Sequence, residues 1–205
     1  MKKVVKFGGS SLASAEQFKK VGAIIRSDAG RRFVVPSAPG KRFDKDTKVT
    51  DMLYACYALA AEGKDFGREL RQIEQRYQEI IDGLELKLSL EKEFSLIREN
   101  FAGKAGKDYA ASRGEYLNGI VMANYLGYEF VDAAEVIVFC EDGSFDMDKT
   151  TEVLGERLKD MKNAVIPGFY GALPDGHVIT FSRGGSDITG SLVAAAIHAD
   201  IYENW

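Results

Sequence analysis

The sequence predicts an α/β protein, a three-layer αβα sandwich with a mainly parallel sheet. Apolar runs rich in Val, Ile and Phe recur along the chain, at residues 3–7, 32–36, 129–132, 136–139, 163–167 and 177–182. Continuous apolar runs are typical of strands that are covered on both faces. Helical patterns separate these runs, and the alternation of strand and helix favours parallel strands with helices on both sides.

The first helical patterns carry recognisable start signals. Ser14, with Gln17 three residues later, predicts a capping box at the start of a helix over 14–28. Thr50 is expected to cap a helix over 50–61, because its hydroxyl can accept a backbone N–H. A charged, periodic, proline-free stretch follows, and it predicts two helices broken near Asp82-Gly83. We expect this stretch, about 63–106, to be a helical excursion from the sheet within a single domain, 1–205.

The later helices are expected over 107–127, 148–161 and 186–199. Gly127 suits the end of the first, since glycine readily adopts the left-handed conformation that closes a helix. The last is almost entirely apolar or small and is therefore expected to be buried. A further strand begins at Ile201, and the chain stops within it, which predicts a fragment of a longer domain.

Composition excludes several classes of protein. The 205 residues are 45% hydrophobic and 28% charged, which is typical of a soluble globular domain. The net charge of −4 leaves no basic field for nucleic acid. The apolar stretch that follows Met1-Lys2-Lys3 is too short for the pattern expected of a signal peptide, and no run approaches the roughly 18 apolar residues that span a membrane. Cys56 and Cys140 have no CxxC partners, so we expect free thiols and a cytoplasmic location.

The segment Lys6-Phe7-Gly8-Gly9-Ser10-Ser11 joins the first strand to a helix. Glycines let backbone N–H groups approach an oxyanion closely, and the helix that follows directs its positive end toward it. Lys6 would then stabilise a transferring phosphoryl group. The alternative is a tight strand–helix turn that carries a lysine. No Walker A sequence or dinucleotide fingerprint is present.

A second such junction occurs at Ser182-Arg183-Gly184-Gly185-Ser186-Asp187. The planar guanidinium of Arg183 suits a carboxylate. Ser186 or Asp187 can cap the last helix. Asp187 has three candidate roles, which are to hold a metal-bound phosphate, to orient Lys6 or to act as a base. The alternative is a capped helix start with a surface arginine.

Three more segments place candidate residues after strands or on a helix. Thr50, beyond the loop Ser37-Ala38-Pro39-Gly40-Lys41, either contacts a ligand or only caps its helix. Glu115 can orient a substrate ammonium and pair with Arg113, or the two form a solvated charge pair. Phe169, in Gly168-Phe169-Tyr170-Gly171, either walls a small pocket or anchors its loop by burial.

These segments together closely resemble the aspartate kinases of the amino-acid kinase superfamily. The matching sequences are KFGGSS at 6–11, VVPSAPGKR at 34–42, TDML at 50–53, RGE at 113–115, PGFYG at 167–171 and FSRGGSDITGSLVA at 181–194. The resemblance spans essentially the whole chain. It implies an amino-acid kinase fold and transfer of phosphate from Mg-ATP to the β-carboxylate of L-aspartate, giving 4-phospho-L-aspartate. This is the first committed step toward lysine, threonine and methionine.

The resemblance also implies roles for individual residues. Lys6 would stabilise the phosphoryl group in flight and Asp187 would organise Lys6. Arg183 would clamp a carboxylate of aspartate and Glu115 would receive its ammonium group. Three further residues would complete the aspartate pocket, namely Thr50, Phe169 and Ser186. Gly8, Gly9 and Ser10 would line the phosphate path. Mg²⁺ would be held mainly through the nucleotide phosphates, without dedicated metal ligands, and the full-length enzyme would be a homodimer.

Two departures and two alternatives accompany this resemblance. The loop from Gly40 to Thr50 is longer than in some relatives. These 205 residues do not include the TDVDG-type segment that supplies most adenine and ribose contacts in aspartate kinases, nor the regulatory ACT domains. We therefore expect the aspartate half of the site and an incomplete catalyst. The alternatives are another family member acting on glutamate, acetylglutamate, carbamate or UMP, and a non-catalytic amino-acid-binding fragment.

Overall fold

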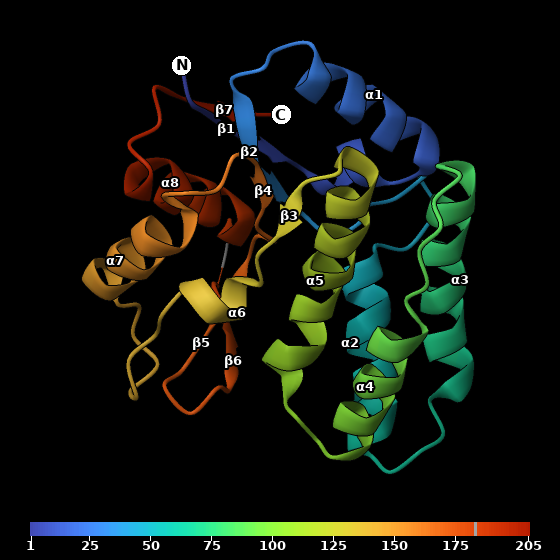
Figure 1. Ribbon diagram of the computed structural model, residues 1–205. Coiled ribbons are helices and arrows are strands. Elements are labelled where there is room, and N and C mark those ends of the chain that lie inside the picture. Colours follow the sequence, from blue (N-terminus) through green and yellow to red (C-terminus); the bar gives the residue numbers. More distant parts are fainter. Residues whose placement is uncertain (183) are drawn as a thin grey trace.

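A five-stranded parallel sheet forms the centre of the molecule (Figure 1). The computed structural model describes residues 1–182 and 184–205. The strand order is β3-β4-β2-β1-β7, and every neighbouring pair is parallel. The strands are β1 (Lys3–Phe7), β2 (Arg31–Pro36), β3 (Glu129–Phe130), β4 (Ala164–Val165) and β7 (Ile201–Asn204). The predicted α/β class with a mainly parallel sheet is confirmed.

The sheet separates two hydrophobic cores. Val5 and Val34 belong to one core, whereas Val4 and Val35 belong to the other. All four side chains are fully buried. Because successive side chains of a strand point to opposite faces, the continuous apolar runs noted in the sequence supply both cores at once. Figure 1 accordingly shows α1 to α5 on one side of the sheet and α7 and α8 on the other.

Five helices cover the first face: α1 (Ala15–Arg26), α2 (Val49–Ala61), α3 (Gly67–Gly83), α4 (Glu91–Ala102) and α5 (Lys107–Leu126). The start predicted for α1 is confirmed, since the Ser14 hydroxyl accepts the backbone N–H of Gln17 at 3.4 Å. Gly127 closes α5 with a φ of 70°, as predicted. The predicted break into two helices near Gly83 is also confirmed by α3 and α4.

The second face holds α6 (Ala133–Val136), α7 (Met147–Leu158), α8 (Gly185–Ala196) and an antiparallel hairpin of β5 (Tyr170–Ala172) and β6 (Val178–Thr180). The strand expected over 136–139 is wrong. Asp132 accepts the N–H of Ala134 at 3.0 Å and so begins α6. Val138 and Phe139 form only isolated bridges.

Two predicted helix caps differ from the structure. α2 begins one residue before Thr50, with Lys48 at the cap position, so Thr50 lies inside the first turn. α8 begins after Gly184, whose φ is 61°, and neither Ser186 nor Asp187 caps it. The reason at α8 is that the helix starts earlier than expected, so both residues lie inside its first turn, where the Asp187 carboxylate pairs with Lys6. Among the described residues, no helix has the length and apolar character needed to cross a membrane.

Candidate active site

Lys6 and Asp187 meet at the carboxyl edge of the sheet. The Lys6 Nζ atom, near the end of β1, lies 2.7 Å from Asp187 Oδ1 in the first turn of α8. Asn204 of β7 donates from Nδ2 to the same oxygen at 3.1 Å. The Lys6 side chain is 12% exposed and that of Asp187 is 49% exposed. The pair therefore joins a largely buried ammonium group to a carboxylate that a ligand can still reach.

The glycine turn after β1 packs directly against the loop after β2. Gly8 donates its N–H to Trp205 O at 2.9 Å, and Gly9 O accepts the N–H of Gly40 at 2.7 Å. A Cβ built on Gly9 would lie 2.8 Å from the Ala38 carbonyl oxygen, so only glycine fits at this position. The backbone contact explains why the sequence has glycine in both segments.

A pocket of about 490 Å³ opens beside this contact. Four predicted site residues line it together, namely Gly9, Ser10, Thr50 and Glu115. The other lining residues are Ala38, Pro39, Gly40, Lys41 and Lys48. Lys41 and Lys48 were not singled out from the sequence. The signal that could have identified them is their place in a loop between the carboxyl end of β2 and the start of α2.

Glu115 of α5 is the most unusual group in the pocket. Its side chain is 6% exposed, and within the described residues its Oε2 atom has no hydrogen-bond partner. Burial raises the pKa of Glu115 to about 8, although the N–H of Ala38 opposes this rise. The carboxyl group is thus mostly protonated at neutral pH, and a cation placed against it would ionise it. A buried carboxyl of this kind suits an ammonium ligand.

The solvated pair that was the alternative for Arg113 and Glu115 is wrong, because both side chains are buried. The Arg113 guanidinium lies 4.3 Å from the ring centroid of Tyr116 and 4.6 Å from that of Tyr109. Its Nε donates to Ser112 Oγ at 3.1 Å. Arg113 is therefore held by aromatic faces and forms no ion pair with Glu115 among the described contacts.

Phe169 and Ser186 pack at the start of α8 and are not among the residues that line the pocket. Phe169 has a φ of 85°, which a non-glycine residue rarely adopts. Its N–H donates to Thr189 Oγ1 at 3.1 Å, which holds this conformation. A Cβ on Gly168 would lie 2.6 Å from Ser186 Cβ. These contacts pack the loop that carries Phe169 against the first turn of α8, which also holds Asp187. Arg183, the remaining candidate, lies outside the described residues.

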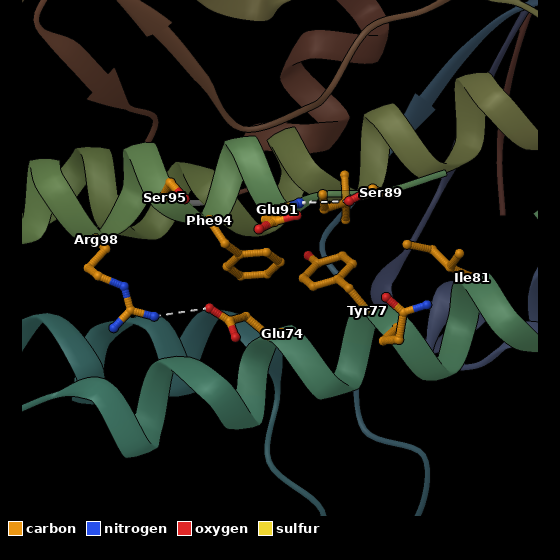
Figure 2. A pocket seen from close by; sticks show the side chains of 10 residues that line it. Glu74, Tyr77, Ile81, Ser89, Glu91, Phe94, Ser95 and Arg98 are labelled. Carbon is orange, nitrogen blue, oxygen red and sulfur yellow. Dashed lines mark hydrogen bonds and ion pairs between the residues drawn. The ribbon is translucent and has the colours of Figure 1, made fainter. Parts of the chain in front are cut away.

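A second hollow of about 480 Å³ lies between α3 and α4 and shares no lining residue with the strand-end pocket. Figure 2 shows Tyr77 facing Phe94, with ring centroids 6.2 Å apart, and an ion pair between Arg98 and Glu74. The Tyr77 hydroxyl is turned away from solvent and donates to Gly114 O at 2.6 Å. Three polar side chains of this hollow, those of Tyr77, Glu74 and Arg98, thus already have partners within the protein.

No dedicated metal centre is evident in the part of the chain that the structure describes, since His, Cys, Asp and Glu side chains form no group of three there. Cys56 and Cys140 are both free thiols. Asp187 is the carboxylate nearest to Lys6 in the glycine-rich region, and one of its oxygens is already paired. A divalent cation at this site would need most of its ligands from a bound phosphate.

The fold and site define an α/β protein with a glycine-lined pocket at the carboxyl edge of a parallel sheet, where two lysines and a buried carboxyl group come together. The model of the amino acid kinase family matches residues 1–205, and the chain belongs to this family.

Aspartokinases are among the similar proteins. The chain is 39% identical to aspartokinase 3 of Bacillus subtilis, over 99% of this chain and 48% of that protein. The crystal structure of Clostridium acetobutylicum aspartate kinase superposes with a TM-score of 0.97 at 51% identity, covering 100% of this chain and 48% of that one. Escherichia coli aspartokinase III in complex with aspartate and ADP gives a TM-score of 0.81 at 25% identity, over 100% and 49%. The chain thus spans about half the length of these relatives.

Proposed function

We propose that residues 1–205 form the aspartate-binding portion of an amino-acid kinase domain, with α3 and α4 as a helical excursion. The full-length protein would transfer the γ-phosphoryl group of ATP to the β-carboxylate of L-aspartate. The observation that carries this proposal is the buried, unpartnered oxygen of Glu115 in a pocket that also holds Lys41 and Lys48. A ligand with one ammonium group and two carboxylates matches these charges. The likeness to aspartokinases over the whole chain supports the same substrate.

The reaction needs no general base. The β-carboxylate of aspartate ionises near pH 3.9 and is already a nucleophile at neutral pH. One of its oxygens would attack the γ-phosphorus in line and form the acyl-phosphate bond. The bond from that phosphorus to the β,γ-bridging oxygen would break, and its electron pair would leave with ADP. Of the three roles open to Asp187, this chemistry favours the orientation of Lys6 over action as a base.

The residues of the chain supply positioning and charge. The Lys6 ammonium group, fixed by Asp187 at 2.7 Å, would face the negative charge that develops on the transferring phosphoryl oxygens. The turn from Gly8 to Ser10 would offer backbone N–H groups along the phosphate path. Mg²⁺, held mainly through the nucleotide phosphates, would neutralise their charge when bound. Thr50 and Glu115 would hold the amino acid on the other side of the turn.

Calorimetric titration of the 205-residue chain tests the substrate. L-aspartate is expected to bind, whereas N-acetyl-L-glutamate, which lacks an ammonium group, should not bind, and L-glutamate should bind less well. Glu115→Gln should abolish aspartate binding, and Glu16→Gln, on the exposed side of α1, should leave it unchanged. Equal binding of aspartate and N-acetyl-L-glutamate would contradict the assignment of Glu115. A folded chain that binds neither would call for the same titration in the full-length protein.

Steady-state assays of the full-length protein test the role of Lys6. Lys6→Ala is expected to lower kcat by about 10²–10³-fold, because it removes charge stabilisation that matters most in the transition state. The KM for aspartate should change much less. Lys20→Ala, an exposed lysine of α1, is the matched control. An unchanged kcat in Lys6→Ala would remove this residue from the mechanism.

The proposal extends to two properties of the whole protein. We expect a homodimer for the full-length enzyme from the resemblance to aspartate kinases, and a cytoplasmic location from the two cysteines without CxxC partners. Sedimentation equilibrium of the full-length protein tests the first, and fractionation of the source cells tests the second.

A further inference from the structure

Arg76 is a charged side chain in the middle of α3 that is only 3% exposed. Burial of an arginine is costly unless its donors find partners. Three contacts engage the two terminal nitrogens of this guanidinium. Nη2 donates to Gly40 O at 2.6 Å and to Ala13 O at 3.2 Å, and Nη1 pairs with Asp46 Oδ2 at 2.7 Å. The Arg76 Nε atom has no partner among the described residues. The guanidinium is therefore aimed at backbone carbonyls as well as at a carboxylate.

Those two carbonyls belong to the two segments that form the strand-end pocket. Ala13 directly follows the short turn Gly9–Leu12, and Gly40 lies in the loop after β2. Gly9 and Gly40 are in backbone contact on the pocket side, where a Cβ on Gly40 would lie 2.6 Å from the Gly9 carbonyl carbon. The Arg76 guanidinium thus binds both segments, and Gly9, Ser10 and Gly40 of these segments line the pocket.

Asp46 does not depend on Arg76 alone. Arg42 donates from Nε to Asp46 Oδ2 at 2.9 Å and from Nη2 to Asp46 Oδ1 at 3.1 Å. These bonds, together with the contact to Arg76, hold the pKa of Asp46 well below its usual range. Removal of Arg76 would leave the carboxylate paired with Arg42. The part that Arg76 alone supplies is the bridge between Ala13 O and Gly40 O.

We propose that Arg76 is a positioning residue for phosphoryl transfer, which sets the spacing between the glycine turn and the loop after β2. The inference rests on the proposed function. The turn would carry the phosphate path, and the loop carries Lys41 and precedes Thr50 and the rest of the aspartate site. Loosening the bridge would shift one reactant relative to the other, and a displacement of about 1 Å can cost about 10²-fold in rate.

The test is steady-state kinetics of the full-length protein with Arg76→Gln, Arg76→Lys and Arg42→Gln. Arg76→Gln should lower kcat by about 10- to 100-fold, with a much smaller change in the KM for aspartate. Arg76→Lys keeps the charge but lacks the planar fork, so its kcat should fall between those of the wild type and Arg76→Gln. Arg42→Gln removes an arginine from the same carboxylate without touching either carbonyl, and its kcat should match that of the wild type.

Thermal unfolding of each variant separates positioning from stability. If Arg76 only stabilised the fold, the apparent kcat of each Arg76 variant would fall in proportion to the fraction of enzyme that is folded at the assay temperature, and no further. An Arg76→Gln protein that is fully folded and has wild-type kcat overturns the inference, and so does an equal loss in Arg42→Gln. If Arg76→Gln does not fold, Arg76→Lys decides, and failure of both to fold assigns Arg76 to the fold alone. A wild-type protein that does not phosphorylate aspartate would instead refute the proposed function.

Discussion

At the scale of the residue, Glu115 shows how a binding site can lower the stability of the chain that carries it. Its pKa of about 8 exceeds the ordinary value of 4.5 because the carboxyl is buried. The folded chain therefore binds this proton more tightly than the unfolded chain does. The stability that the neutral form contributes is fully present below pH 4.5 and is lost as the pH rises toward about 8.

Glu115→Gln is expected to raise the melting temperature of the chain at pH 8 and to change it little at pH 5. Glutamine keeps the shape of the protonated carboxyl group and cannot ionise. Thermal unfolding followed by circular dichroism at the two pH values measures this difference, and Glu16→Gln is the control at an exposed position. An equal effect of Glu115→Gln at both pH values would show that this carboxyl titrates normally.

The same proton predicts how aspartate binding depends on pH. If the ligand ammonium requires the ionised carboxylate, binding must expel the proton. The dissociation constant should then fall about tenfold for each pH unit from pH 6 toward 8, and level off above it. Calorimetry in buffers of different ionisation enthalpy should also detect close to one proton released at pH 7. A dissociation constant that is flat between pH 6 and 8 would contradict this linkage.

At the scale of the element, two helical glycines should respond in opposite ways to alanine. A Cβ on Gly114 of α5 would lie 2.8 Å from Ala38 Cβ and 3.4 Å from Leu53 Cδ1. Gly114→Ala should therefore push the pocket loop away, lowering both stability and aspartate affinity. A Cβ on Gly155 of α7 would meet only Ala196 O, at 3.5 Å. Gly155→Ala should gain about 1 kcal/mol from helix propensity. Urea unfolding measures the stability of the two variants, and calorimetry measures their affinity for aspartate. A stabilised Gly114→Ala variant would show that the loop carrying Ala38 moves away from the new methyl group at little cost.

The elements themselves were largely predictable because their patterns are local. The apolar runs of β1 and β2 and the start of α1 follow from side-chain period and capping chemistry. The failures arose where tertiary contacts outweigh local signals. Asp132 begins a helix where Val136–Phe139 suggested a strand, and α8 begins at Gly185, so that Asp187 lies in its first turn and pairs with Lys6. Short β5 carries no pattern of its own and exists through its pairing with β6.

The site was predictable only as a set of separate motifs. The sequence placed Lys6 and Asp187 at two glycine-rich junctions, and the parallel order of β1 and β7 brings those junctions together. It gave no sign of Arg76, because an arginine in a charged helical stretch resembles any solvated residue until the fold shows what it contacts. The ion-pair hypothesis for Arg113 failed because the guanidinium packs against aromatic rings instead. Tyr109 and Tyr116 come from α5 itself, and Tyr170 comes from β5.

At the scale of the whole molecule, the two cores share one sheet, and this should make unfolding cooperative. Val5 and Val4 are neighbours on β1 but belong to different cores, so loss of either helical layer exposes a face of the same strands. Leu70→Ala in α3 and Leu154→Ala in α7 each remove a fully buried side chain, at a cost of about 2–5 kcal/mol. Each should lower the midpoint of one common urea transition without splitting it.

Two probes can test this cooperativity in the 205-residue chain. Circular dichroism reports mainly the helices, and Trp205, the single tryptophan, reports the β1–β7 edge, where it stacks on Phe7 with centroids 6.2 Å apart. The unfolding curves from circular dichroism and from Trp205 should coincide for the wild type and for both variants. The reason is that neither helical layer can unfold without exposing a face of the shared sheet. Leu96→Ala, at a position 46% exposed on α4, should leave the midpoint unchanged. A separate early transition in Leu70→Ala, seen by circular dichroism and not by Trp205, would show that the helices of the first face unfold independently of the sheet.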